Sequence, residues 1–239
     1  MADSPAAKPF FGEMADFFDR RAQTETFRER QRRFLEVARL ALERSTIDRP
    51  LCLDLGCGPG AISLALARLG FDTIGVDSSA AMVEIATNAA TDSDEGNGRC
   101  TFECMDLGEF LEGFKGEADL IVSSSVFEYL EDPTRTLELV AGRLRAGGIF
   151  AASVPNVRSV YRWVEPALLL RRPRAARYRR EWRNRMRARE LTNAARAFGL
   201  ERAHTSYFGQ IVIKGRPLFG RFTRFPFIGT MTLVVLVRR

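Results

Sequence analysis

The chain has 239 residues, of which 46% are hydrophobic and 28% are charged. These fractions exclude an intrinsically disordered chain and are typical of a single globular domain. The four cysteines have no paired C-x-x-C spacing and the one histidine lies far from them in the sequence, so we expect no disulfide framework and no bound metal. Because the sequence has no signal-peptide pattern and no run of about 18 apolar residues, we expect a cytoplasmic protein.

The net charge of +6 is concentrated in one segment. Residues 171–189, the arginine block, contain ten arginines and one acid, Glu181, which leaves a net charge of −3 for the rest of the chain. A block of this kind indicates either a surface for an anionic partner or a solvated helix face.

The predicted elements begin with helices and then alternate. Residues 10–42 have apolar side chains at helical spacing among many charges, and we interpret them as two helices that stop near Arg49 and Pro50. Strands are then predicted at residues 51–55, 73–76, 100–105, 119–123 and 149–154, and helices at residues 61–69, after Ser79 and at residues 133–144. This alternation predicts an α/β fold with a doubly wound parallel sheet and helices on both faces.

After Pro155 the alternation breaks. The arginine block follows, then a predicted helix at residues 190–198 and two predicted closing strands at residues 200–208 and 230–237. We therefore interpret the residues after Pro155 as an insertion before the last elements of the sheet.

A glycine-rich turn joins the first predicted strand to the next helix. Its sequence, Asp54-Leu-Gly-Cys-Gly-Pro-Gly60, places Gly56, Gly58 and Gly60 where a buried strand turns sharply. Glycine tolerates positive φ, and its missing Cβ lets a ligand contact the backbone. Because the spacing is G-x-G-x-G rather than the dinucleotide pattern G-x-G-x-x-G, the turn predicts a ligand without identifying it.

Two aspartates follow the next two predicted strands. Asp77 ends the second strand, where a carboxylate can accept both hydroxyls of an adenosine ribose. Asp106 follows the third strand and can accept a hydrogen bond from an adenine amino group. The alternative for each is that it caps the turn that follows. Together with the glycine turn, the two aspartates favour an adenosine-containing ligand.

These motifs resemble those of the class I S-adenosylmethionine-dependent methyltransferases, small-molecule branch, over residues 50–155. The glycine turn resembles their first motif, Asp77 their ribose-binding acid and residues 104–106 their adenine-side motif. Residues 118–133 resemble their fourth-strand motif, and residues 144–148 the turn before the fifth strand. The resemblance implies S-adenosyl-L-methionine as cofactor, S-adenosyl-L-homocysteine as product, and cofactor-binding roles for Asp54, Gly56, Gly58, Gly60, Asp77, Asp106, Leu107 and Ser123.

The resemblance also implies a Rossmann-like seven-stranded sheet, completed by an antiparallel C-terminal hairpin. We expect one methyltransferase domain over residues 1–239, divided into an N-terminal helical lid, a cofactor-binding core, a basic cap insertion, and a C-terminal helix with closing strands, at residues 1–49, 50–155, 156–190 and 191–239. The lid would cover the cofactor, with Phe17, Phe18 and Asp19 as contacts.

Methyl transfer from a sulfonium is an in-line displacement, so orientation of the acceptor supplies several kcal/mol and a base is optional. For a phenol, enol or carboxylic acid acceptor, a base takes one proton, and the candidates are Glu128, Tyr161 and His204. Each has a structural alternative. Glu128 can accept a hydrogen bond from a backbone N–H at the mouth of the site. Tyr161 can form a wall of the site, and His204 can be an ordinary strand residue.

The insertion favours several kinds of partner. Tyr178, Trp182 and Met186 recur at every fourth position among arginines, which predicts one helix face. Such a helix can lie on an anionic membrane, bind an anionic or lipid-like acceptor, contact RNA, or pack its aromatic stripe on the core. We therefore include peripheral contact with an anionic membrane through residues 161–189 among the expectations.

We expect a small-molecule acceptor, with O-methylation favoured. Residues 123–126 are Ser-Ser-Ser-Val, whereas base-directed enzymes of this fold carry an N-P-P-Y or D-P-P-Y run there, which disfavours nucleic acid as a partner. The alternatives are an RNA methyltransferase that uses the arginine-rich insertion and a non-catalytic S-adenosylmethionine-binding module.

Overall fold

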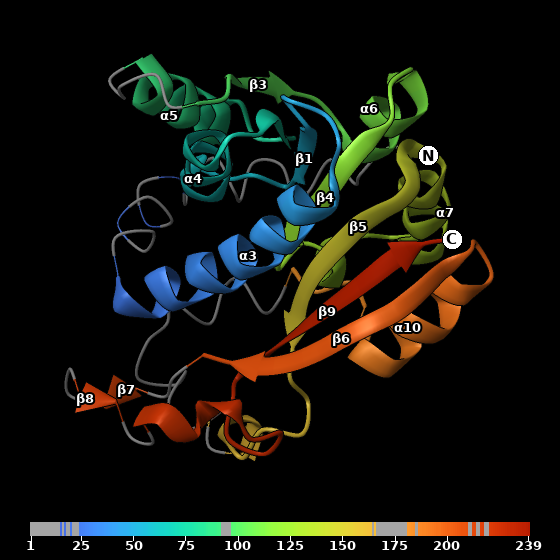
Figure 1. Cartoon of the computed structure of the whole chain (residues 1–239). Coiled ribbons are helices and arrows are strands. Elements are labelled where there is room, and N and C mark those ends of the chain that lie inside the picture. The colour runs from blue at the N-terminus through green and yellow to red at the C-terminus, as the bar shows by residue number, and fades with distance from the viewer. Residues whose placement is uncertain are drawn as a thin grey trace.

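A seven-stranded sheet with the strand order β3-β2-β1-β4-β5-β9-β6 organises the computed structural model (Figure 1). The structure describes residues 15, 17, 20, 24–91, 97–163, 165, 181–184, 186–209, 212–213, 216–217 and 220–239. The strands of the sheet are β1 (Leu51–Leu55), β2 (Asp72–Asp77), β3 (Cys100–Cys104), β4 (Ala118–Ser124), β5 (Leu144–Pro155), β6 (Leu200–Phe208) and β9 (Met231–Arg238). Strands β1 to β5 are parallel, and β9 is antiparallel to both β5 and β6. The predicted doubly wound fold with an antiparallel C-terminal hairpin is confirmed.

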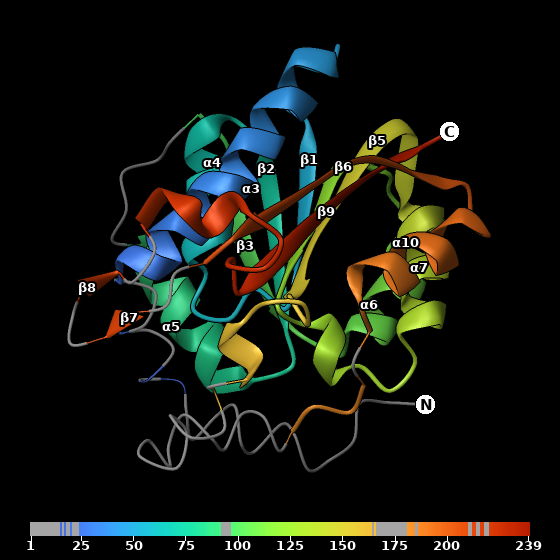
Figure 2. The ribbon, with the colours of Figure 1, turned by 90° about the horizontal axis from the view of Figure 1, so that it is seen from below.

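Helices cover both faces of the sheet (Figure 2). One face carries α3 (Glu25–Arg44), α4 (Ala61–Leu69) and α5 (Ala80–Thr91), and the other carries α6 (Leu107–Gly113), α7 (Pro133–Arg143) and α10 (Ala188–Arg196). The shorter elements include η1 (Phe127–Tyr129), η2 (Gly220–Arg224), and a small pair of strands, β7 (Val212–Ile213) and β8 (Arg216–Pro217). Among the described helices, none combines the length and the apolar character needed to cross a membrane.

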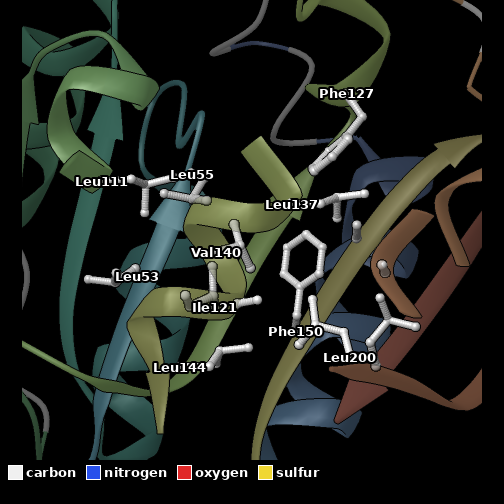
Figure 3. Packing of buried hydrophobic residues seen from close by; sticks show 14 of the residues in the cluster. Leu53, Leu55, Leu111, Ile121, Phe127, Leu137, Val140, Leu144, Phe150 and Leu200 are labelled. Carbon is white, nitrogen blue, oxygen red and sulfur yellow. The ribbon is translucent and has the colours of Figure 1, made fainter. Parts of the chain in front are cut away.

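Successive residues of the central strands pack into two different cores, one on each face. On the face of α6, α7 and α10, Ile121 of β4 and Phe150 of β5 pack with Leu137 of α7 (Figure 3). On the other face, Val122 of β4 packs in the same cluster as Phe34 of α3. This is why the central strands are continuously apolar in sequence, as expected for a parallel sheet buried on both sides.

The N-terminal region is described mainly through α3. The helix begins after Thr24, whose hydroxyl accepts from the N–H of Phe27 at 3.4 Å, and it ends at Arg44, before the predicted stop. Of the predicted lid contacts, Phe17 is half-buried, whereas Phe18 and Asp19 lie outside the described residues.

Two expectations about helices are corrected by the structure. Residues 107–113, for which the sequence predicts no element, form α6 after β3. The prediction that Tyr178, Trp182 and Met186 lie on one helix face is wrong for the two residues that the structure describes, because Trp182 and Met186 lie in non-helical segments. Tyr178 lies outside the described residues. The side chain of Asn184 explains why the backbone is not helical here. Its amide donates to the carbonyls of Phe127 and Leu130 at 2.6 and 2.7 Å, and its oxygen accepts from the N–H of Met186 at 3.0 Å.

Candidate functional site

The glycine turn lies at the carboxyl edge of the parallel strands, between β1 and α4. Gly56, Gly58 and Gly60 have φ values of +72°, +54° and +80°, all in the left-handed region that favours glycine. The N–H groups of Gly56 and Cys57 both donate to the carbonyl of Val76, at 2.8 and 3.0 Å. These bonds hold the turn against the end of β2.

The three glycines differ in what surrounds them. A Cβ on Gly56 would lie 2.3 Å from a methyl of Val126, and one on Gly60 would lie 2.7 Å from the ring of Phe102, so both positions are glycine because of packing. A Cβ on Gly58 would meet no atom within 4 Å. Gly58 therefore faces open space, where a ligand can approach its backbone.

Asp77 is fixed beside that open backbone. Its carboxylate accepts from the N–H of Gly58 at 2.9 Å through one oxygen and from the N–H of Ser79 at 3.0 Å through the other. Burial raises the pKa of Asp77, and the two N–H donors act against this rise. Each carboxylate oxygen has a second lone pair, so the group can accept two further hydrogen bonds. The hydroxyl of Ser79, the residue before α5, has no hydrogen-bond partner among the described residues.

Asp54 provides a second buried carboxyl group under the turn. One oxygen accepts from the hydroxyl of Ser63 at 2.6 Å, and the other has no partner in the described part of the chain. Burial raises the pKa of Asp54 to about 7, against the hydrogen bond from Ser63. An orphaned carboxyl oxygen of this kind is an acceptor that a bound cation or N–H donor would satisfy.

The remaining predicted cofactor residues have mostly structural contacts. Asp106 accepts from the N–H groups of Gly108 and Glu109, at 2.8 and 3.3 Å, which is the capping alternative considered for it. The Leu107 side chain is buried in the core, but as the first residue of α6 its N–H has no acceptor within the helix. Ser123 is buried on β4 and donates to the carbonyl of Leu55 at 3.2 Å.

Glu128 is the buried carboxyl group on the β4 side of the turn. It follows Ser125, the one non-glycine residue with positive φ (+60°) in the part of the chain that the structure describes. Such outliers cluster at functional sites. Burial raises the pKa of Glu128 to about 7, while its own backbone N–H, Arg30 and Arg162 lower it. Its Oε2 has no partner among the described side chains and backbone groups.

Helix α3, part of the expected N-terminal lid, reaches this edge of the sheet, but Arg30 and Gln31 were not among the predicted site residues. Arg30 donates to the hydroxyl of Ser124 at the end of β4 (3.3 Å), and Gln31 donates to the carbonyl of Ala61 at the start of α4 (2.7 Å). Both polar side chains lie between the apolar residues Phe27 and Phe34 in the sequence. This position between apolar residues is the signal that could have indicated a role at the site. It is weak, because charged residues in a helix are also typical of a solvent-exposed face.

The two other base candidates lie in different places. Tyr161 is half-buried after β5, with the guanidinium of Arg162 5.6 Å from its ring centroid and 5.7 Å from that of Trp182. His204 is exposed on β6, at the edge of the sheet, and three strands separate it from β1. The structure therefore brings Glu128, and not His204, to the glycine turn, because the Val126 methyl that faces Gly56 lies two residues before Glu128. Among the described residues, no group of three His, Cys, Asp or Glu side chains could hold a metal ion.

Residues 19–205 match the methyltransferase domain family. A ubiquinone biosynthesis O-methyltransferase from Caulobacter vibrioides is 28% identical over 186 residues, which cover 72% of this chain and 66% of that protein. A protein of the same name from Coxiella burnetii is 32% identical over 104 residues, covering 44% of this chain. The match spans only 43% of the length of the Coxiella protein.

Two solved structures share the fold. Magnesium protoporphyrin IX methyltransferase from Synechocystis, solved with bound S-adenosyl-L-homocysteine, superposes with a TM-score of 0.69 at 17% identity, covering 98% of this chain and 99% of that one. The N-methyltransferase NodS from Bradyrhizobium japonicum, in complex with the same molecule, has a TM-score of 0.61 at 16% identity, covering 92% of this chain and 90% of that one. The family match extends over more than half of the sequence. The chain belongs to the methyltransferase domain family.

Proposed function

We propose that this chain transfers a methyl group from S-adenosyl-L-methionine to an oxygen atom of a small molecule. The observation that carries the proposal is the hydrogen bond from the N–H of Gly58 to the carboxylate of Asp77. The space beside the Gly58 backbone is open, because a Cβ there would meet no atom within 4 Å. A carboxylate held in this way can accept both ribose hydroxyls of the cofactor.

The other residues of the carboxyl edge suit the remaining parts of the cofactor. The N–H of Leu107, at the start of α6, lies beside Asp106, and the N–H of Met105 donates to the carbonyl of Asp77 at 3.1 Å, which joins this strand end to the ribose site. We assign the adenine to this position. The orphaned oxygen of Asp54 suits the amino group of the cofactor's methionine part. When bound, S-adenosyl-L-methionine supplies a methyl group on a positively charged sulfur.

We assign to Glu128 the removal of a proton from the acceptor. A carboxyl group with a pKa of about 7 is substantially ionised at neutral pH and can remove a proton from a phenol, enol or carboxylic acid. The names of the two relatives, both O-methyltransferases, support oxygen as the methylated atom.

The test is transfer of an isotopically labelled methyl group to a panel of phenols, carboxylic acids, amines and RNA. We expect labelled oxygen products, and a Glu128→Gln variant should turn over about 10²-fold to 10⁴-fold more slowly with unchanged cofactor affinity. Glu43→Gln, an exposed change near the end of α3, serves as the matched control. Label that appears only on amines or RNA, or full turnover by Glu128→Gln, would contradict the proposal.

A further inference from the structure

Two segments far apart in the sequence form one body at the carboxyl end of β5. Pro155, the last residue of β5, pairs with Met231, the first residue of β9, so the segments that follow and precede them meet at the same edge of the sheet. Figure 1 shows both at its lower edge, beyond the ends of these strands. Within this body the amide of Asn156 donates to the carbonyls of Pro226 and Gly229, both at 2.7 Å.

Further hydrogen bonds join the two segments. The N–H of Val160 donates to the carbonyl of Phe227 at 2.8 Å, and the hydroxyl of Ser159 donates to that of Ile228 at 3.1 Å. On its inner side, Thr223 donates to the carboxylate of Glu29 on α3 at 3.4 Å. The body is thus fastened to the same helix that carries Arg30 to the end of β4.

The outer side of this body exposes large apolar side chains. Six of the nine exposed large hydrophobic residues in the described part of the chain are here: Trp163 (85% exposed), Phe227 (60%), Phe225 (56%), Phe222 (51%), Val157 (41%) and Val160 (39%). The rings of Phe222 and Phe225 stack with centroids 6.2 Å apart. The Val160–Phe227 hydrogen bond brings the two segments that carry these side chains together. Exposed apolar residues are ordinarily scattered singly, so a group of six on one joined body indicates a site of interaction.

The exposed charged residues next to these side chains in the sequence are arginines. Arg158 and Arg224 are exposed beside them, and residues 156–163 contain no acid. From residue 202 to residue 239 the sequence has no Asp or Glu. Aromatic side chains with arginines fit the boundary between anionic headgroups and acyl chains, where the rings bury and the guanidinium groups meet phosphate.

We propose that this aromatic-basic face, comprising Val157, Arg158, Val160, Trp163, Phe222, Arg224, Phe225 and Phe227, binds the surface of an anionic phospholipid membrane. The face adjoins the carboxyl edge of the sheet, so binding would turn the glycine turn and Glu128 toward the lipid. It replaces the aromatic stripe as the membrane contact, because Trp182 lies beneath Arg162 and Met186 packs against the core. The proposal concerns binding alone and does not depend on methyl transfer.

Flotation of the full chain with vesicles tests the proposal. We expect binding to vesicles of equal parts phosphatidylcholine and phosphatidylglycerol, little binding to pure phosphatidylcholine, and loss of binding at high salt. The double variant Arg158→Gln/Arg224→Gln should weaken binding roughly fivefold per arginine, and the triple variant Phe222→Ser/Phe225→Ser/Phe227→Ser should weaken it at least tenfold. Matched controls are Arg39→Gln/Arg202→Gln and Leu40→Ser/Ile47→Ser, which change exposed residues elsewhere and should bind normally.

Tryptophan fluorescence supplies an independent readout that separates the face from the stripe. Anionic vesicles should shift the emission to the blue, and the shift should vanish in Trp163→Phe and persist in Trp182→Phe. The opposite pattern would overturn the proposal, as would equal binding to neutral vesicles. So would concentration-dependent self-association that the phenylalanine variants abolish, because the face would then contact a second copy of the chain.

Discussion

At the scale of single residues, Gly58 offers the clearest separation of ligand binding from folding. Its φ of +54° and its open surroundings are matched by Gly199, which has a φ of +77° and no atom within 4 Å of a built Cβ. Valine should strain the backbone similarly at both positions, by about 1–3 kcal/mol. We expect Gly58→Val to lose cofactor binding and Gly199→Val to retain it, with similar thermal stability in both. Normal binding by a folded Gly58→Val protein would show that the turn is only structural.

The buried carboxyl groups of Glu128 and Asp54 make a prediction about pH. In the unfolded chain their pKa values are about 4.3 and 3.9, whereas burial raises the pKa of each to about 7 in the folded state. Between about pH 4 and 7 the folded state therefore binds more protons than the unfolded state, so these two groups lower the stability as the pH rises.

The variants Glu128→Gln and Asp54→Asn should each regain roughly 1–3 kcal/mol of the free energy of unfolding that the wild type loses by pH 8. Denaturant unfolding at pH 5 and pH 8 measures this free energy. A Glu128→Gln protein whose stability falls with pH as steeply as the wild type would show that Glu128 ionises normally in the folded state. Glu43→Gln, an exposed change on α3, is the control for replacing a glutamate.

At the scale of elements, the segment around Asn184 holds η1 in place. The backbone N–H groups of Arg183 and Asn184 donate to the carbonyl of Glu128, at 2.9 and 3.3 Å, in addition to the Asn184 side-chain bonds to Phe127 and Leu130. Removing the amide leaves two carbonyls without that donor, which should cost about 1–3 kcal/mol.

We therefore expect Asn184→Ala to lower the free energy of unfolding by this amount and also to slow turnover, because η1 carries Glu128. Asn193→Ala, an exposed change on α10, should alter neither quantity. Chemical denaturation and steady-state kinetics measure the two effects. Full stability in Asn184→Ala would show that solvent replaces the amide without loss.

How well the sequence predicted each element depended on how strongly the local pattern was tied to burial. β1 and α4 begin and end at the predicted residues, because buried apolar runs bounded by glycine or proline leave little choice. β6 also begins and ends as predicted, although its middle is exposed, because Gly199 and Gly209 bound it. α6 was missed because a seven-residue helix has too few periods to stand out. The helix predicted through Trp182 failed because long-range bonds from Asn184, which no local pattern reveals, determine the backbone there.

At the scale of the whole molecule, the topology explains which site residues the sequence could find. Gly58, Asp77 and Asp106 follow neighbouring parallel strands, and the carboxyl ends of such strands meet at one edge. His204 lies away from the glycine turn because β9 places β6 at the far edge of the sheet, which fits the alternative that it is an ordinary strand residue. Arg30 was missed because only the tertiary structure shows that α3 reaches the end of β4.

The binding of S-adenosyl-L-homocysteine to the wild type and to Asp77→Asn, measured by calorimetry, tests the central claim most directly. Asp72→Asn, at the other end of β2, is the matched control, because that side chain pairs with Arg49 on the surface. We predict binding by the wild type and by Asp72→Asn, and a loss of about 1.5–3 kcal/mol in Asp77→Asn from weakened charge-assisted hydrogen bonds to ribose. Equal affinity in a folded Asp77→Asn protein, or no binding by the wild type, would contradict the account.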